Sequence, residues 1–469
     1  MNKLLAPIKA MKASYIPLLM VYFAVGFGGI ASVTNTFFMK DVVSLTAAQL
    51  ISLGIWTGLP WSIKMVFGAM IDGIPIFGNN RKNYIYLGNF LIMLGTLGMI
   101  DHASTQFIFT HLGEYLGLLL TGLLSSNGVV MADIVADTMA IEVVEDGPEK
   151  DKELGMVQVL SRLSISTGML LGAALTGPLA AAFTPAYVYA MTLICPLMST
   201  IATIFTKLKQ NIQKSALNKK VLIGGIIYGA ICILAGTFLG EYSQLVVFAV
   251  AMCTLIYMLR SVIDDMPEKT VKSFIMAMIA IFLFRTVPEI GPAEKWFYIE
   301  QLGFDAHFLG TLSIVAAVSA FVVLWALADS ITNHSIFKTM TVLVILATVL
   351  SMPNILVYYG IHEMIGISAK TLILADTAMI GPLGQLSMIP LGVLIARNAP
   401  VSTRAVYISL TASLMNIALV GGDLITKQLN KIFVVTRTDF SQLGELMIFS
   451  LAISTFLSII GLIVLRRSK

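Results

Sequence analysis

The chain has 469 residues, of which 57% are hydrophobic and only 12% are charged, and its formal net charge is +4. This composition excludes a water-soluble protein and indicates an integral membrane protein with many spans, and its small positive charge gives no sign of nucleic-acid binding. The three cysteines and five histidines have no metal-ligand spacing, so we expect the protein to bind no metal and no cofactor. No nucleophile stands beside a suitable base, so we do not expect an enzyme.

Long hydrophobic segments follow one another along the chain. Since a helix needs about 20 apolar residues to cross a membrane, they predict about fourteen spans. We place these spans at 14–39, 47–71, 84–100, 111–140, 154–182, 185–206, 219–239, 243–262, 271–291, 306–328, 336–358, 370–396, 404–428 and 444–465. With both termini in the cytoplasm, most lysines and arginines fall on the cytoplasmic side, as the charge bias of membrane proteins requires.

The loop after the second span is short and basic. It carries Asp72, Arg81 and Lys82, and the next cytoplasmic loop is acidic between Glu142 and Glu153. Pairing between these opposite charges would lock a cytoplasmic gate. The alternative is that both loops are solvated and take no part in gating.

Charged residues also lie inside first-half spans, where each is costly unless it is paired or wetted. Asp133 and Asp137 are four residues apart and therefore share one face of a helix. Because two neighbouring carboxylates resist being ionised together, this pair is a candidate for proton coupling. The alternative is a structural role, in which Lys64 and Arg162 neutralise the acids and brace the N-terminal half.

The span at 271–291 combines two charges with helix-breaking residues. Arg285 and Glu289 lie one turn apart, Pro288 stands between them, and Gly291-Pro292 follows. A break here would expose backbone groups to a cavity, which is where carriers bind polar substrates. Arg285 could then bind a substrate carboxylate, and Glu289 a cationic group or a proton. The alternative is that Arg285 and Glu289 pair with each other.

A second polar position lies in the span at 370–396. Asp376 is followed by a likely kink at Gly381-Pro382 and then by Gln385. Both side chains are candidates for substrate binding. The alternative for Asp376 is a place at the membrane interface.

The two halves of the chain resemble each other. The segment FFMKDVVSLTAAQL, from Phe37, aligns without gaps to WFYIEQLGFDAHFL, from Trp296. This repeat predicts two six-helix bundles, at 1–206 and 271–469, with a basic connector and an extra transmembrane hairpin between them at 207–270. Such repeats are typical of the major facilitator fold, in which the substrate site lies between the halves.

Several motifs in this order resemble those of the folate–biopterin transporter family and together cover nearly the whole chain. They are LPWSIKMVFGAMIDGIPIFGNNRKNYI, ADIVADTMAIE, FLFRTVPEIGPAEKWFYIEQLGFDAHFLG and LADTAMIGPLGQLSMIPLGVLIARNAP. The resemblance implies a secondary carrier of pterin-type compounds. It also admits S-adenosylmethionine as a substrate.

We therefore expect a monomeric transporter that moves a folate- or pterin-like solute by alternating access, coupled to protons, in a bacterial inner membrane. A carrier of another metabolite, such as S-adenosylmethionine or an amino-acid-like compound, is the alternative within this class. A receptor or scaffold that moves no solute is the alternative from another class. Against it stands the lack of a sizeable soluble domain to pass on a signal.

Overall fold

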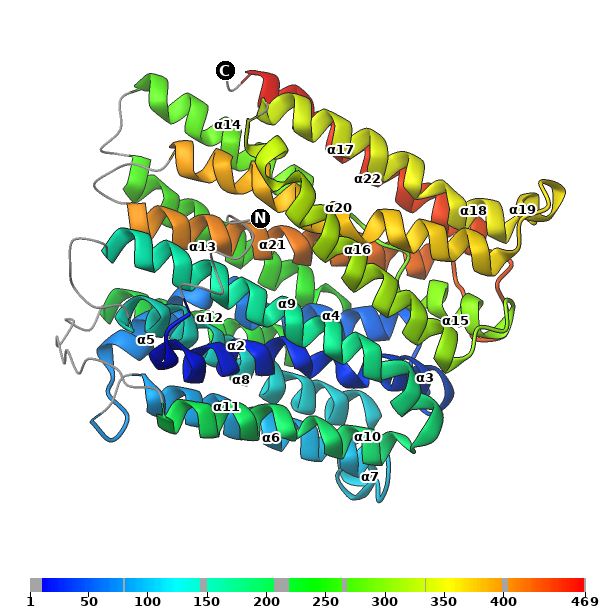
Figure 1. The fold of residues 1–469 in the computed structure, drawn as a ribbon, viewed down its shortest axis with the longest axis horizontal. Helices are drawn as coiled ribbons and strands as arrows, with labels where there is room; N and C mark the ends of the chain where they lie inside the picture. Colours follow the sequence, from blue (N-terminus) through cyan, green and yellow to red (C-terminus); the bar gives the residue numbers. More distant parts are fainter. Residues whose placement is uncertain are drawn as a thin grey trace. The chain divides into compact units, whose positions relative to one another are not determined.

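The structure is a computed structural model and describes residues 11–78, 81–143, 150–205, 219–263, 268–333, 335–398 and 404–467. Within these ranges every regular element is a helix (Figure 1). Nine helices in this part of the chain are long and apolar enough to cross a membrane. Large apolar side chains such as Phe205, Ile233 and Tyr257 are exposed, as a lipid-facing surface requires. The all-α membrane fold is confirmed, whereas the count of fourteen spans stays a prediction.

Contacts between helices divide the chain into two compact units, each discontinuous in sequence. Unit 1 contains Met1–Ser44, Val66–Gly225 and Ala306–Ile314. Unit 2 contains Leu45–Met65, Ile226–Asp305 and Val315–Lys469. Some of these boundaries fall inside helices, so a helix can belong to both units. The three-part division at 206 and 270 that the sequence suggests stays a prediction.

Unit 1 is a bundle of helices that run side by side in Figure 1. Its elements are η1 (Ala13–Tyr15), α2 (Ile16–Phe27), η2 (Gly28–Ala31), α3 (Ser32–Asp41), α5 (Lys64–Gly73), α6 (Lys82–His102), α7 (Phe107–Leu112), α8 (Glu114–Glu142), α9 (Lys150–Ala182), α10 (Pro185–Thr192) and α11 (Ile194–Phe205). Helix α6 packs along α8, α2 packs along α9, and α11 contacts both α2 and α6. The first expected span, 14–39, is interrupted by the 3-10 turn η2.

Glycines let α2 and α9 approach closely. A β-carbon added at Gly26 of α2 would lie 2.1 Å from the carbonyl oxygen of Ile165, and one at Gly168 of α9 would lie 2.4 Å from that of Phe23. Gly29, in the adjoining turn, has open space at the same position. The contact between the two helices therefore depends on Gly26 and Gly168 rather than on every glycine nearby.

Unit 2 contains the remaining helices. They are α4 (Ala47–Ser62), α12 (Lys219–Phe238), η3 (Gly240–Tyr242), α13 (Ser243–Ile263), α14 (Glu268–Arg285), α15 (Pro292–Glu300), α16 (Ala306–Asn333), α17 (Ile336–Leu350), α18 (Met352–Tyr358), α19 (Ile361–Met364), α20 (Ala369–Asn398), α21 (Arg404–Ile432) and α22 (Leu443–Arg467). The first turns of α12 and α16 belong to unit 1. Helix α4 packs along α21, and α14 packs along α22.

The core of unit 2 includes α12 and α13, which lie where the sequence predicts an extra hairpin. Val247 of α13 is buried in one apolar cluster with Phe274 and Ile281 of α14 and with Leu410 and Leu414 of α21. Helix α13 also packs directly along α21. The hairpin is therefore part of the packed interior of unit 2.

We expect the substitution Gly26→Ala to destabilise unit 1, because the new methyl group would overlap the backbone of α9. Overpacking of this kind costs about 1–3 kcal/mol. The measurement is thermal unfolding of the purified protein in detergent, with Gly29→Ala as the matched control. An equal loss of thermal stability in the two variants would contradict the proposed contact.

Candidate functional site

The helix that begins at Glu268 breaks where the sequence predicts. Helix α14 ends at Arg285 and α15 begins at Pro292, and the residues between them are not helical. Pro288 has no N–H to donate, and Gly291 has a φ of +83°, which favours glycine. The break therefore follows from local chemistry.

Side chains of α22 bind one carbonyl group of this break. The carbonyl oxygen of Pro288 accepts a hydrogen bond from the hydroxyl of Ser450 at 3.2 Å and another from that of Ser454 at 3.1 Å. Both serines lie on the same face of α22, one turn apart. They supply the donors that the chain itself cannot, because the residue four positions further on is Pro292, which has no N–H.

Side chains of α21 bind two further backbone groups. The N–H of Glu289 donates to Thr426 Oγ1 at 2.9 Å, and the carbonyl oxygen of Ile290 accepts from Asn430 Nδ2 at 3.0 Å. Thr426 and Asn430 are buried and also lie one turn apart. Two helices thus hold the open segment in place.

A cavity of about 630 Å³ lies beside the break, inside unit 2. Apolar side chains of α14, α17 and α20 form much of its wall, together with hydroxyl groups of α17 and α22. Its charged and amide groups are Glu289, Glu294, Lys295 and Asn354. A mostly apolar cavity with a few polar groups at one place is typical of a small-molecule site.

Arg285 and Glu289 do not pair with each other. The ion pairs found in the described part of the chain do not include one between them. Glu289 is in the cavity wall, whereas Arg285 is not. Arg285 Nε is buried and has no hydrogen-bond partner among the described residues. The two charges thus have different surroundings, although they lie four residues apart.

Asp376 is buried behind the cavity wall. Its Oδ2 lies 3.5 Å from Asn354 Nδ2, and Asn354 Oδ1 accepts a hydrogen bond from the hydroxyl of Tyr298. The same hydroxyl is 3.3 Å from Glu294 Oε1. Lys295 Nζ lies 3.6 Å from Glu294 Oε2. The side chain of Gln385, the other residue expected on α20, lies outside the described structure.

The acids of unit 1 have different partners. Asp137 accepts a hydrogen bond of 3.1 Å from the hydroxyl of Tyr22, while Asp133 is half-buried on the same helix, α8. Lys64 Nζ lies 5.6 Å from the ring centre of Trp61, and Arg162 is exposed on α9. Neutralisation of the acids by Lys64 and Arg162, like their role in proton coupling, stays a prediction.

The basic loop binds the end of a neighbouring helix. Lys82 Nζ donates to the carbonyl oxygen of Ile204 at 3.1 Å, at the end of α11, where the helix dipole favours a cation. Arg81 immediately precedes α6. The side chain of Asp72 and much of the acidic loop lie outside the described residues, so the gate also stays a prediction.

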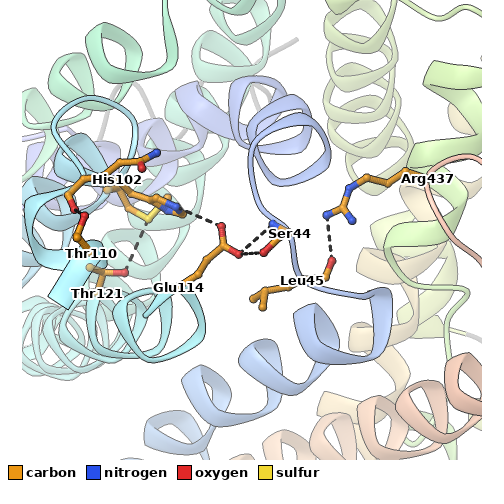
Figure 2. A network of polar contacts seen from close by, with 9 residues as sticks. Ser44, Leu45, His102, Thr110, Glu114, Thr121 and Arg437 are labelled. Atoms are coloured by element: carbon orange, nitrogen blue, oxygen red, sulfur yellow. Dashed lines mark hydrogen bonds and ion pairs between the residues drawn. The ribbon is translucent and has the colours of Figure 1, made fainter. Parts of the chain in front are cut away.

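Figure 2 shows a polar contact in unit 1 that the sequence does not predict. His102 Nε2 lies 3.5 Å from Glu114 Oε1, and Glu114 Oε2 accepts the N–H of Ser44 at 2.9 Å and its hydroxyl. His102 is buried and stacks on Phe109. The contact joins the ends of α3, α6 and α8, and its residues are too far apart in sequence to predict it.

Two cations of unit 2 also bind carbonyl oxygens. Arg437 donates to the carbonyl oxygen of Leu45 at 2.9 Å (Figure 2). Lys427 is buried and donates to Gln244 Oε1 at 2.6 Å. Gln244 Nε2 in turn donates to the carbonyl oxygen and the hydroxyl of Ser52, each at 2.8 Å. The sequence signal for this network was Gln244, a lone amide at the start of an apolar span.

Comparison with known families gives a match along nearly the whole chain. The model of the BT1 family matches residues 25–468. The chain is 24% identical over 440 residues to a folate-biopterin transporter of Synechocystis sp., which covers 93% of this chain and 78% of the relative. It is 21% identical over 414 residues to folate transporter 1 of Plasmodium falciparum, which covers 88% of this chain and 72% of the relative.

Solved structures of similar fold include transporters. A crystal structure of a POT family transporter in complex with a thioalcohol-conjugated peptide matches with a TM-score of 0.69 at 14% identity, over 99% of this chain and 100% of the other. A crystal structure of the peptide transporter POT in complex with sulfate matches with a TM-score of 0.68 at 15% identity, over 97% of this chain and 95% of the other. This likeness confirms the major facilitator fold.

We expect Thr426→Val to destabilise the break, because the partly buried N–H of Glu289 would lose its acceptor. A fully buried donor left without a partner costs about 1–3 kcal/mol, so the loss here should lie at the lower end of that range. The measurement is thermal unfolding of the purified protein. Thr286→Val is the matched control, since the hydroxyl of Thr286 bonds only within its own chain segment, to the carbonyl oxygen of Phe282. Equal stability of the two variants would count against the role given to Thr426.

Proposed function

The chain belongs to the BT1 family, and we propose that it is a secondary transporter that carries a folate- or pterin-like solute across the membrane. The observation that carries this proposal is the break between Arg285 and Pro292, which lies beside a cavity of about 630 Å³. Broken helices beside charged groups are how carriers of this kind bind polar solutes inside a membrane. Two similar proteins, a folate-biopterin transporter and a folate transporter, support the same solute class.

The charges at the break suit the two ends of a folate molecule. Arg285 ends α14 beside the break but is not in the cavity wall, so its side chain would have to turn toward the cavity to bind a substrate carboxylate. Its Nε has no partner of its own among the described residues, and its fork of N–H groups suits a carboxylate. The pterin ring presents neighbouring N–H groups along one edge, and the carboxylates of Glu289 and Glu294 in the cavity wall can accept them. We assign substrate binding to Arg285 and Glu289, with Asp376 and Gln385 on α20 as further candidates.

We propose that transport occurs by alternating access and is driven by protons. Asp133 and Asp137 share one face of α8, and Glu289 lies close enough to Asp423 for their charges to repel. Carboxylates in such pairs resist being ionised together, which makes a proton easier to hold. Asp133, Asp137 and Glu289 are therefore our candidates for coupling. In this scheme Asp72, Arg81 and Lys82 close the cytoplasmic side.

A cationic or zwitterionic solute is the second candidate. The described wall of the cavity contains the carboxylates of Glu289 and Glu294 but only one cation, Lys295, an excess of acid that favours a solute with a positive group. S-adenosylmethionine and amino-acid-like compounds have such a group. Competition of each compound with labelled folic acid would rank them.

The protein is an integral membrane protein, and we place it in a bacterial inner membrane as a monomer with both termini in the cytoplasm. A receptor or scaffold that moves no solute is the competing class. Counterflow of labelled folic acid in proteoliposomes decides between these classes, because only a carrier exchanges solute across a sealed membrane.

We expect Arg285→Gln to raise the KM for folic acid by about 10- to 100-fold, the range for loss of a hydrogen bond between charged groups. The KM for biopterin, which has no carboxylate, should change much less. Uptake of each labelled compound into proteoliposomes measures the difference, with Arg467→Gln at the chain's exposed end as the control. An equal rise for both compounds would remove Arg285 as the carboxylate anchor.

We expect Asp133→Asn to abolish the increase in folic acid uptake that an inward acid gradient produces, since the amide cannot bind the coupling proton. Uptake is measured with and without the gradient in the same preparation of proteoliposomes. A full gradient response in the variant would exclude Asp133 from the mechanism.

A further inference from the structure

Asp376 is the most deeply buried acid in the described part of unit 2. Only 6% of its surface is exposed. Its Oδ1 has no hydrogen-bond partner among the described residues, and its Oδ2 is 3.5 Å from the amide nitrogen of Asn354. A single long contact is far less than an ionised carboxylate needs when it is removed from water.

The charged groups that face Asp376 come from one helix. They are Glu294 and Lys295 of α15. The hydroxyl of Tyr298, on the same helix, also interacts electrostatically with Asp376. Helices α14, α17, α18, α19 and α21 also pack against α20 but bring no further charge to Asp376 within the described residues.

The cation nearest to Asp376 already has other partners. Lys295 Nζ lies 3.6 Å from the carboxylate of Glu294 and 5.0 Å from the ring centre of Tyr298. Nearly half of the Lys295 side chain is exposed. Glu294 therefore partly neutralises Lys295, and the ion pairs of the described residues include none to Asp376.

Side chains connect Asp376 to the cavity wall. Asn354 bonds through Oδ1 to the hydroxyl of Tyr298 and presents Nδ2 to Asp376. Tyr298 also reaches Glu294. Asn354 and Glu294 both line the cavity. A change of charge at Asp376 therefore affects the side-chain amide of Asn354, which a solute bound in the cavity would contact.

We propose that Asp376 is a proton-binding site of unit 2 and that its proton sets the orientation of Asn354 in the cavity wall. A proton from cavity water adds to the carboxylate and leaves a neutral acid, which removes a charge that would be costly in an apolar setting. The ionised form draws the Asn354 amide toward itself, whereas the neutral acid releases it. As a coupling site, this assignment rests on the proposed transport function.

Infrared difference spectroscopy of the purified protein tests the proton site without any solute. The carbonyl stretch of a protonated carboxylic acid is separate from the bands of carboxylates and amides. We expect such a band to appear on acidification, to be lost in Asp376→Asn and to persist, shifted, in Asp376→Glu. An unchanged band in Asp376→Asn would overturn the proposal.

Asp439→Asn is the matched control for that measurement. Asp439 lies in the exposed loop before α22, and hydrogen bonds from Ser441 hold the pKa of its carboxyl below the usual value. It therefore stays ionised to a lower pH than an ordinary aspartate, so the band should not change in this variant.

Transport gives a second readout. In proteoliposomes with labelled folic acid, Asp376→Asn should abolish the accumulation that an inward acid gradient drives, because the amide cannot bind the proton. Accumulation that still follows the gradient in this variant would overturn the coupling role. If the wild-type protein moves no folic acid but shows the infrared band, the transport proposal fails while the proton site stands.

Discussion

The structure depends on the need to bond every backbone group inside an apolar membrane. Without water, an unbonded N–H or C=O costs several kcal/mol, so a span can break only where side chains replace the lost partners. Between α14 and α15 those partners are Ser450 and Ser454 of α22 and Thr426 and Asn430 of α21. These hydrogen bonds from α21 and α22 offset the free energy lost at the break, so the open segment can persist beside the cavity.

The same constraint distinguishes charges that have a partner within the protein from charges that do not. Lys427 is buried, yet the carbonyl group of Gln244 binds it. Arg285 and Asp376 each retain a buried polar atom without a partner among the described residues. We propose that a substrate completes Arg285 and that a proton completes Asp376.

Local chemistry made much of this fold predictable from the sequence. Composition indicated a helical membrane protein, and Pro288 with Gly291-Pro292 located the break, because these residues act on their own backbone. The partners of the break were not predictable, since Ser450 is 162 residues from Pro288 and a single sequence does not link the two. The buried position of Lys427 was missed for the same reason, as its acceptor Gln244 belongs to another helix.

Helices α12 and α13 have a consequence for any attempt to shorten this chain. Val247 belongs to the apolar core of unit 2, and Gln244 is the acceptor for Lys427. A shortened protein that joined α11 directly to α14 would leave part of α21 uncovered and remove the acceptor of the Lys427 ammonium group. Unit 2 therefore needs this helix pair to keep both its core and its buried cation intact.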